Sequence, residues 1–276
     1  MNKLFAGCSA AAVFHASIAL SADLPNRSAA PPVAAPPAFT WTGFYLGANA
    51  GYSWNRSQTR YGYSLANTAD FAEFNAARLV PQQLGRDNDS FVVGGQLGYN
   101  HQIGWLVLGA EADLQYLGAR QQAAYATTVT DGIGSATVTT GTRSSIDWLG
   151  TVRGRVGVAF DRVLVFATGG VAFGRSADRT TITTVGFDDD GTFSGAWFGQ
   201  RSGTRAGWTL GGGVEYALTQ NVTLKAEYLY YDLGRAKHAV TGFSTDPDDE
   251  FLGANARRKV NGSIVRAGLN WKFSTY

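Results

Sequence analysis

Charged residues occupy only one side of a two-residue alternation in a series of segments between Trp41 and the end of the chain. Apolar and polar positions alternate in segments of roughly ten residues, close to the length of a tilted transmembrane strand. These segments are residues 45–53, 91–100, 106–116, 148–160, 163–174, 208–216, 223–231 and 265–273. The segment at 163–174 is apolar on both parities, so its pattern does not decide which side faces inward. In every other segment the apolar parity carries no charge.

The polar parity holds all the charged side chains of these segments, which are Glu111, Asp113, Arg153, Arg155, Glu215, Lys225, Glu227, Arg266 and Lys272. An arginine or lysine on a lipid-facing surface costs about 2–4 kcal/mol at the bilayer midplane, so the segregation indicates that the apolar parity faces hydrocarbon. Aromatic residues gather at the segment ends, as interfacial girdles require. They are Trp41, Phe44, Tyr52, Phe91, Tyr99, Trp105, Tyr116, Trp148, Phe160, Trp208, Tyr216, Trp271 and Phe273.

The connections between the segments alternate in length. Tight turns are predicted at residues 101–104, 161–162 and 218–221, and long polar loops at residues 55–89, 118–143, 175–204 and 234–260. Short periplasmic turns and long extracellular loops are typical of outer-membrane barrels. The sequence therefore predicts an all-β, eight-stranded antiparallel up-and-down transmembrane barrel. A soluble barrel or sandwich would also alternate, but the aromatic girdles and the unequal connections disfavour it.

The N-terminal part is predicted to direct export rather than to fold with the barrel. Residues 1–22 combine a positive start, an alanine-rich apolar run and small residues at the end, which is typical of a signal peptide. Residues 23–40, rich in proline and alanine, are expected to form an extended periplasmic linker before a barrel at 41–276. Cys8 lies in the signal segment, so the mature chain has no thiol for disulfides or cysteine-based zinc and redox sites.

The interior of an eight-stranded barrel is just wide enough for side chains to fill. The nearly balanced acids and bases of the polar parity therefore predict a paired ionic network that makes the barrel rigid, because buried charge must be paired. A thin conduction path for small ions or solutes remains open as the alternative. The formal net charge of +2 is too small to indicate a surface that binds nucleic acid.

No catalytic, metal or cofactor site is predicted. After the signal segment only His101, in a predicted turn, and His238, in a predicted loop, remain as histidines, and catalysis would need several groups brought together. The acidic runs at 188–190 and 246–250 match no defined cation site, so we interpret them as solubilising loop charge.

One basic run suggests a partner at the outer rim. Arg257, Arg258 and Lys259 directly precede the last segment, and three adjacent cations at an anionic surface favour contact with lipopolysaccharide phosphates.

Residues 41–52 (WTGFYLGANAGY) resemble the opening strand of the alphaproteobacterial outer-membrane immunogenic protein family, the Brucella-type surface antigens of the porin family. Further stretches are similar to the same family, and these are 148–157 (WLGTVRGRVG), 168–172 (TGGVA), 207–216 (GWTLGGGVEY) and 265–273 (VRAGLNWKF). The resemblance implies a surface protein without known catalysis and a C-terminal signal for the barrel-assembly machinery. Members of the family tend to end at an aromatic residue, whereas Ser274, Thr275 and Tyr276 follow Phe273 here. The assembly signal can therefore be Trp271 with Phe273, or Trp271 with Tyr276.

These observations favour a non-enzymatic outer-membrane surface protein that contributes to envelope structure and integrity. A narrow porin, or an adhesin or haem-binding protein acting through its loops, are the alternatives. The expected partners are outer-membrane lipid, lipopolysaccharide and the assembly machinery, with a host or small-molecule ligand at the loops as a further candidate and no nucleic acid.

Overall fold

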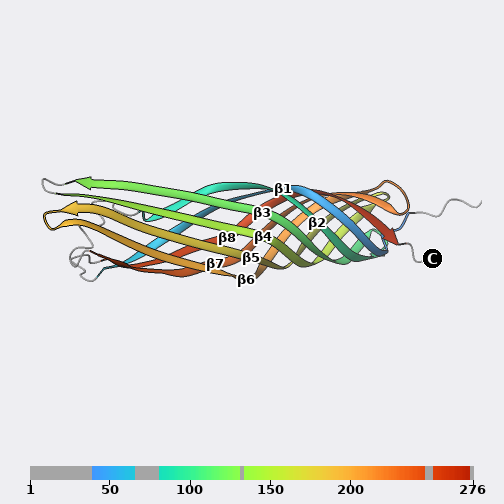
Figure 1. Cartoon of the computed structure of the whole chain (residues 1–276). Helices are drawn as coiled ribbons and strands as arrows, with labels where there is room; N and C mark the ends of the chain where they lie inside the picture. Colours follow the sequence, from blue (N-terminus) through green and yellow to red (C-terminus); the bar gives the residue numbers. More distant parts are fainter. Residues whose placement is uncertain (1–38, 66–80, 131–133, 246–250, 274–276) are drawn as a thin grey trace, which may run out of the picture. The chain divides into compact units, whose positions relative to one another are not determined.

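The computed structural model describes residues 39–65, 81–130, 134–245 and 251–273, and within them eight β-strands form one closed ring (Figure 1). The strands are β1 (Gly43–Leu65), β2 (Gln83–Ile103), β3 (Leu106–Thr130), β4 (Ser135–Phe160), β5 (Val163–Asp188), β6 (Gly191–Ala217), β7 (Val222–Ser244) and β8 (Phe251–Phe273). Each strand is antiparallel to its neighbours, and β8 closes the ring on β1, with Phe44 opposite Phe273. The predicted eight-stranded up-and-down barrel is therefore confirmed. In this part of the chain no helix is long and apolar enough to cross a membrane.

The alternation of the sequence becomes an inside and an outside of the barrel wall. On β2, for example, Phe91, Val93 and Leu97 are exposed on the outer surface, whereas Gln96 and Asn100 are buried inside. Successive side chains of a strand point to opposite faces, so one parity reaches the lumen throughout. The apolar parity of every segment that could be assigned from the sequence lies outside.

The facing of the fifth segment, which the sequence left open, is settled by its pairing with two assigned neighbours. On β5, Leu164, Phe166 and Ala172 are buried in the lumen, whereas Val165 and Val171 are exposed outside. Because Val165 pairs with Val158 on β4 and with Val214 on β6, it shares their outward face.

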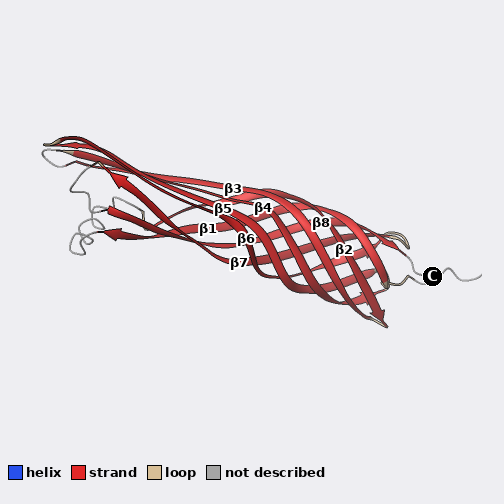
Figure 2. Cartoon of the chain, turned by 60° about the horizontal axis from the view of Figure 1, so that its bottom comes forward, coloured by secondary structure: helices blue, strands red, loops and turns tan. Residues whose placement is uncertain are grey.

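Where the structure describes them, the four long polar segments lie at one end of the barrel, as expected, but the prediction that they are loops is wrong for most of these residues, which are in strands. The strands have 21–27 residues, about twice what a bilayer requires, and continue as hairpins beyond the crossing strands of the barrel (Figure 2). β5 and β6, for instance, stay paired as far as Asp188 and Gly191. Most outward side chains here are polar, with exceptions such as Val185 and Phe198, so the segments lack the continuous apolar outer parity that marks a membrane strand.

Three smaller expectations are also corrected. His101 lies in β2 opposite Leu108, and His238 lies in β7 opposite Ala256, so neither is in a turn or loop. Trp41 is buried and belongs to no girdle. Its backbone N–H donates to Gln102 Oε1 (2.8 Å) and its indole N–H to the Asp161 carbonyl (3.2 Å), which holds the ring across the mouth of the lumen. The expected signal peptide and the linker up to residue 38 lie outside the described residues.

Candidate functional site

The charged parity of β3, β4, β6, β7 and β8 converges on the lumen. Every residue of this set is buried, and the set is Glu111, Asp113, Arg153, Arg155, Glu215, Lys225, Glu227, Arg266 and Lys272. All except Lys272 contact one another, and we call these eight residues the lumen network. It contains four acids and four bases, so its formal charge is zero.

Two arginines from opposite parts of the ring share the same carboxylates. Arg153 on β4 donates to Glu227 Oε1 (2.6 Å), to Asp113 Oδ2 (2.8 Å) and to Glu111. Arg266 on β8 donates from Nε to Glu227 Oε2 (2.8 Å) and from Nη2 to Asp113 Oδ2 (3.0 Å). Guanidinium groups suit this role because their donors are fixed in a fork that matches carboxylates. The two side chains therefore tie β3, β4, β7 and β8 together across the lumen.

The remaining bases complete the network. Lys225 Nζ lies 2.9 and 2.8 Å from the two carboxylate oxygens of Glu111, and Arg155 Nη2 donates to Glu215 Oε2 at 2.8 Å. A buried ion pair is tolerated only when its geometry is good and its other polar atoms are hydrogen-bonded. Each carboxylate here meets more than one donor, which fits most of that requirement; among the described residues, Asp113 Oδ1 and the Nε atoms of Arg153 and Arg155 have no hydrogen-bond partner.

Neutral polar side chains, which charge segregation alone did not single out, extend the network. The Tyr45 hydroxyl donates to Glu111 Oε2 (2.7 Å) and accepts from Arg155 Nη1 (3.0 Å), so it joins two charged residues. Glu215 Oε1 also accepts from Thr223 (2.5 Å) and Asn270 (2.8 Å). These residues lie on the charged parity, so the strand alternation is the signal that could have identified them.

Lys272 is separated from the network at the short-turn end of the lumen. Its Nζ lies 4.2 Å from the centre of the Phe39 ring and donates to the Thr40 carbonyl. Phe39 packs edge-on against Trp41, with ring centroids 4.9 Å apart. Trp41 in turn belongs to an apolar group that closes this end of the lumen, which we call the lower layer (Trp41, Val107, Ala159, Leu164, Phe166 and Ala217).

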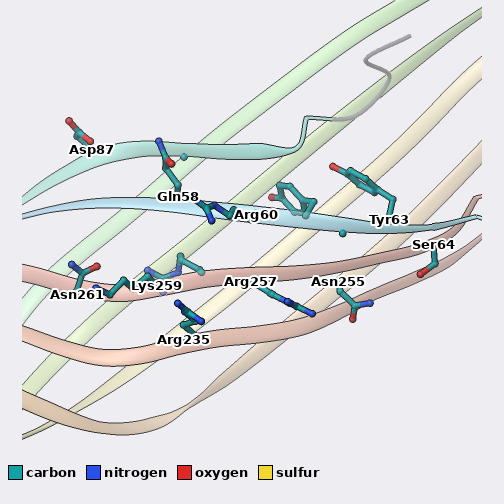
Figure 3. Close-up of a pocket in the computed structure, with 14 residues that line it drawn as sticks. Gln58, Arg60, Tyr63, Ser64, Asp87, Arg235, Asn255, Arg257, Lys259 and Asn261 are labelled. Atoms are coloured by element: carbon teal, nitrogen blue, oxygen red, sulfur yellow. The ribbon is translucent and has the colours of Figure 1, made fainter. Parts of the chain in front are cut away.

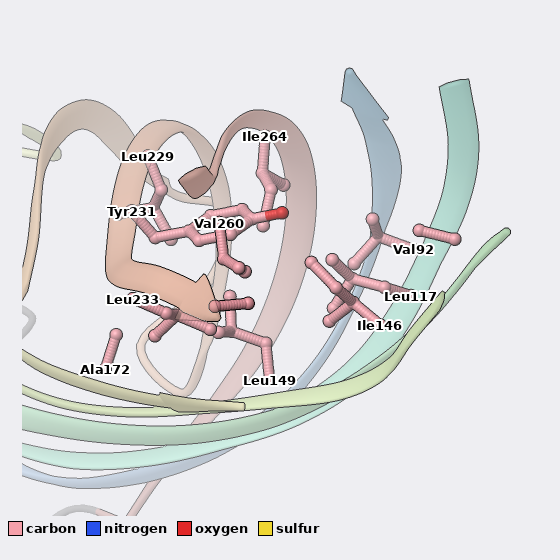
Figure 4. Packing of buried hydrophobic residues seen from close by; sticks show 12 residues of the cluster. Val92, Leu117, Ile146, Leu149, Ala172, Leu229, Tyr231, Leu233, Val260 and Ile264 are labelled. Carbon is pink, nitrogen blue, oxygen red and sulfur yellow. The ribbon is translucent and has the colours of Figure 1, made fainter. Parts of the chain in front are cut away.

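Above the lumen network the interior becomes apolar. β7 continues from Glu227 to Leu229, and β8 continues, against the chain direction, from Arg266 to Ile264 and Val260. They belong to the middle layer, in which side chains from across the ring point toward one another (Figure 4). Its members are Val92, Leu117, Ala119, Ile146, Leu149, Ala172, Leu229, Tyr231, Leu233, Ala236, Val260 and Ile264. The lumen network therefore lies between two apolar layers.

A second, smaller polar level lies inside the hairpins. Arg258 Nε donates to Asp178 Oδ1 at 2.6 Å, and His238 Nε2 lies 3.0 Å from the Thr180 hydroxyl oxygen. A third apolar group covers this level, which we call the upper layer (Tyr61, Val138, Ile182, Trp197, Val240, Ala254 and Ala256).

The basic run expected at the rim is divided by the strand alternation. Arg257 and Lys259 face outward, whereas Arg258 is buried and bound to Asp178. Arg258 therefore cannot contribute to a contact with lipopolysaccharide, because consecutive residues of a strand point to opposite faces.

Two further expectations concern the chain end and metal binding. Trp271 and Phe273 are exposed on the outer wall of β8, while Tyr276 lies outside the described residues. Asp188 Oδ1 accepts from the backbone N–H groups of Asp190 (2.9 Å) and Gly191 (3.1 Å), so it stabilises the β5–β6 turn. The described ranges contain no group of three or more histidine, cysteine, aspartate or glutamate residues that could hold a metal ion. The acidic run at 246–250 lies outside them.

Comparison with known proteins agrees with this architecture. Residues 28–273 match the model of the outer membrane protein beta-barrel domain. The chain is 37% identical over 270 residues to the 31 kDa outer-membrane immunogenic protein of Brucella melitensis, covering 96% of this chain and 97% of that protein. It is 32% identical over 198 residues to the 22 kDa outer membrane protein of Rhizobium leguminosarum, covering 71% of this chain and 66% of that protein.

Two solved structures of bacterial proteins are similar to this chain at low sequence identity. Neisserial surface protein A matches with a TM-score of 0.29 at 16% identity, covering 84% of this chain and 98% of that one. The attachment invasion locus protein Ail of Yersinia pestis matches with a TM-score of 0.28 at 10% identity, covering 82% and 99%. On the family match and the Brucella relative, the chain belongs to the outer-membrane β-barrel family that includes the outer-membrane immunogenic proteins, and it is a protein of the cell outer membrane.

Proposed function

We propose that the protein is a closed, non-conducting and non-enzymatic barrel that contributes to the structure and integrity of the outer membrane. The observation that carries this proposal is the position of the lumen network between the lower and middle apolar layers. The ionic groups bind one another from opposite walls instead of lining an open path. Their role is then mechanical, because they connect strands that are not neighbours in the sheet.

A narrow porin is the competing function, and the apolar layers argue against it. An ion that entered the lumen would lose water at the lower layer, then pass the network, and lose water again at the middle layer. Hydrophobic constrictions in channels close the path by dewetting. A charged network therefore does not make a conduction path when the middle layer closes one side with Leu, Ile and Val side chains and Trp41, Leu164 and Phe166 narrow the other.

The absence of catalysis is part of the proposal. The carboxylates and guanidinium groups of the network are engaged with one another, and none faces an open cleft. His238 is held beside Thr180 between the middle and upper layers. The relatives described above are named as outer-membrane and immunogenic proteins, which supports the same view.

The test is the electrical conductance of refolded protein in planar bilayers, with a known porin at the same protein-to-lipid ratio as the positive control. Gel mobility before and after boiling identifies the folded barrel. We expect no steady current from the folded protein. A steady current that changes when Arg153 or Glu227 is replaced would establish the porin and overturn the proposal.

Contact with other molecules at the cell surface is a second candidate, favoured by the hairpin extensions. β3 and β4 stay paired as far as Thr130 and Ser135, so the hairpins carry their tips well beyond the girdles. Replacing residues 183–196 by an Asn-Gly turn would shorten the β5–β6 hairpin without changing its register, because Thr183 pairs with Ala196. The test compares adhesion to host cells and haem binding of the full chain and of the shortened protein. If the full chain shows either property and the shortened protein shows it equally, this hairpin has no part in such a role.

A further inference from the structure

A groove in which cations predominate lies on the outer wall of the hairpin region, over β1, β2, β7 and β8. It encloses about 1050 Å³, and Arg60, Arg235, Arg257 and Lys259 line it together with one acid, Asp87 of β2 (Figure 3). All four cations are exposed. The groove therefore opens sideways, away from the lumen and toward whatever surrounds the barrel.

The strand register places three cationic side chains next to one another. Arg257 on β8 pairs with Arg60 on β1 and with Lys237 on β7, which forms a row of three cations across three strands. In the part of the chain that the structure describes, none of the three forms an ion pair with an acid, whereas the neighbouring Lys259 lies 3.1 Å from Asp232. Like charges directly opposite each other destabilise a sheet. A bound anion would offset that repulsion.

The height of the groove on the barrel indicates what the anion is attached to. Trp54 on β1 packs near Tyr228, with ring centroids 6.2 Å apart, and these exposed rings belong to the upper girdle. Arg257 lies six residues beyond Ser263, the partner of Trp54, or about 20 Å along the strand at 3.3 Å per residue. Because a transmembrane strand is tilted by about 45°, the row lies about 14 Å above the girdle, outside the hydrocarbon region and on the side where lipopolysaccharide extends from the membrane.

We propose that this groove binds the phosphate groups of lipopolysaccharide through the row formed by Arg60, Lys237 and Arg257, in which Arg60 and Arg257 line the groove and Lys237 lies beside Arg257 on β7. Arginine forks bind phosphate in bidentate fashion, and two arginines flank one another here at the spacing of paired strands. Arg258, the middle member of the basic sequence run, borders the groove but is not part of the row, because its side chain is buried and donates to Asp178. The proposal is independent of whether the lumen conducts ions.

The test compares binding of detergent-dispersed lipopolysaccharide, before and after chemical removal of its phosphates, to the folded protein. The variants are Arg257→Gln alone and the triple variant Arg60→Gln/Lys237→Gln/Arg257→Gln. Each cation near a membrane surface contributes roughly a fivefold change in affinity, so the triple variant should bind intact lipopolysaccharide about 100-fold more weakly. Arg162→Gln, which removes a cation at the short-turn end, is the matched control for the single variant, and Arg60→Lys/Arg257→Lys keeps the charge.

The results separate the sources of phosphate. Binding that is lost with the phosphates and with the triple variant, but kept by Arg162→Gln, supports the proposal. The lysine variant keeps the charge without the bidentate forks, so its affinity should lie between those of the wild type and the triple variant. Equal affinity of wild type and triple variant overturns it, as does equal binding of the dephosphorylated lipid. Competition by micromolar inorganic phosphate would assign the groove to free phosphate and overturn the lipid assignment. If the triple variant does not show the boiling-dependent gel shift of a folded barrel, Arg257→Gln decides, with an expected loss of roughly fivefold.

Discussion

Arg153 of β4 and Glu227 of β7 meet across the lumen, with Nη1 and Oε1 2.6 Å apart, although their strands are not neighbours in the ring. Both side chains are buried, and each has further partners in the network. The barrel is thus filled at this level by side chains that reach from opposite walls, which is the geometry expected of a narrow eight-stranded barrel.

Removing one charge from this contact should destabilise the barrel strongly. In Glu227→Gln the guanidinium groups of Arg153 and Arg266 lose a shared counter-charge inside the barrel. Breaking a buried pair in this way costs about 3–5 kcal/mol in the free energy of unfolding. Urea unfolding in lipid vesicles, followed by tryptophan fluorescence, measures the loss.

The control for this variant is Asp232→Asn, which breaks the ion pair between Asp232 and the exposed Lys259. Surface pairs contribute about 0–1 kcal/mol, so this change should be close to neutral. Equal effects of the two substitutions would contradict the mechanical role of the lumen network.

A second prediction concerns the space that a glycine leaves for Tyr45. A Cβ on Gly98 would overlap the phenol of Tyr45, whose hydroxyl connects Glu111 with Arg155. Gly98→Val should therefore displace the ring and lower the free energy of unfolding by about 1–3 kcal/mol, as overpacking does. Gly95→Val is the matched control on the same strand, because Gly95 faces outward and its nearest neighbour, the Gly47 carbonyl, is 3.5 Å from the added Cβ. A stable Gly98→Val barrel would show that the Tyr45 contact is dispensable.

The sequence determines the facing of the membrane strands because lipid imposes a rule on one parity. Glu111 and Arg153 could be placed in the lumen since a charge on the other side would meet hydrocarbon. This rule does not determine which charged side chains pair with one another inside the lumen. Lys272 obeys the same parity as Arg266, yet it lies near the Phe39 ring at the lumen mouth, because distance along the strand decides which level a side chain reaches.

The hairpins show where the rule stops. Outside the membrane both faces of a strand tolerate polar residues, so the alternation weakens and residues 175–204 resemble a loop in sequence. Inward positions of the hairpins still hold apolar residues such as Ile182 and Trp197, but isolated apolar residues are a weak signal of a strand. The expectation for Arg258 is wrong for the same reason. Three consecutive cations suggest one surface patch, but the alternation of the strand places Arg258 inside the barrel and Arg257 and Lys259 outside.

A third prediction separates the wall that touches hydrocarbon from the wall that touches water. Val152 on β4 and Val185 on β5 both face outward and are 54% and 58% exposed, but Val152 lies between the girdles and Val185 lies on a hairpin. Val152→Arg should cost about 2–4 kcal/mol in vesicles, whereas Val185→Arg should be nearly neutral. Unfolding free energies from urea titration of the two variants make the comparison. A large cost at Val185 would place the hairpin within the bilayer.

The last prediction concerns pH. Burial lowers the pKa of His238 below its ordinary value near 6.5, and Arg258 and Arg201 act in the same direction while Asp178 opposes them. The imidazole is then neutral in the folded hairpin at pH 7, and between its folded pKa and 6.5 the unfolded chain binds more protons. The free energy of unfolding should therefore decrease as the pH falls below 6.5, and should level off below the folded pKa. Titration of the His238 ring by NMR, with His238→Gln to assign its signal, should give a midpoint below 6.5; a midpoint at or above 6.5 would mean that water or Asp178 stabilises the charged ring.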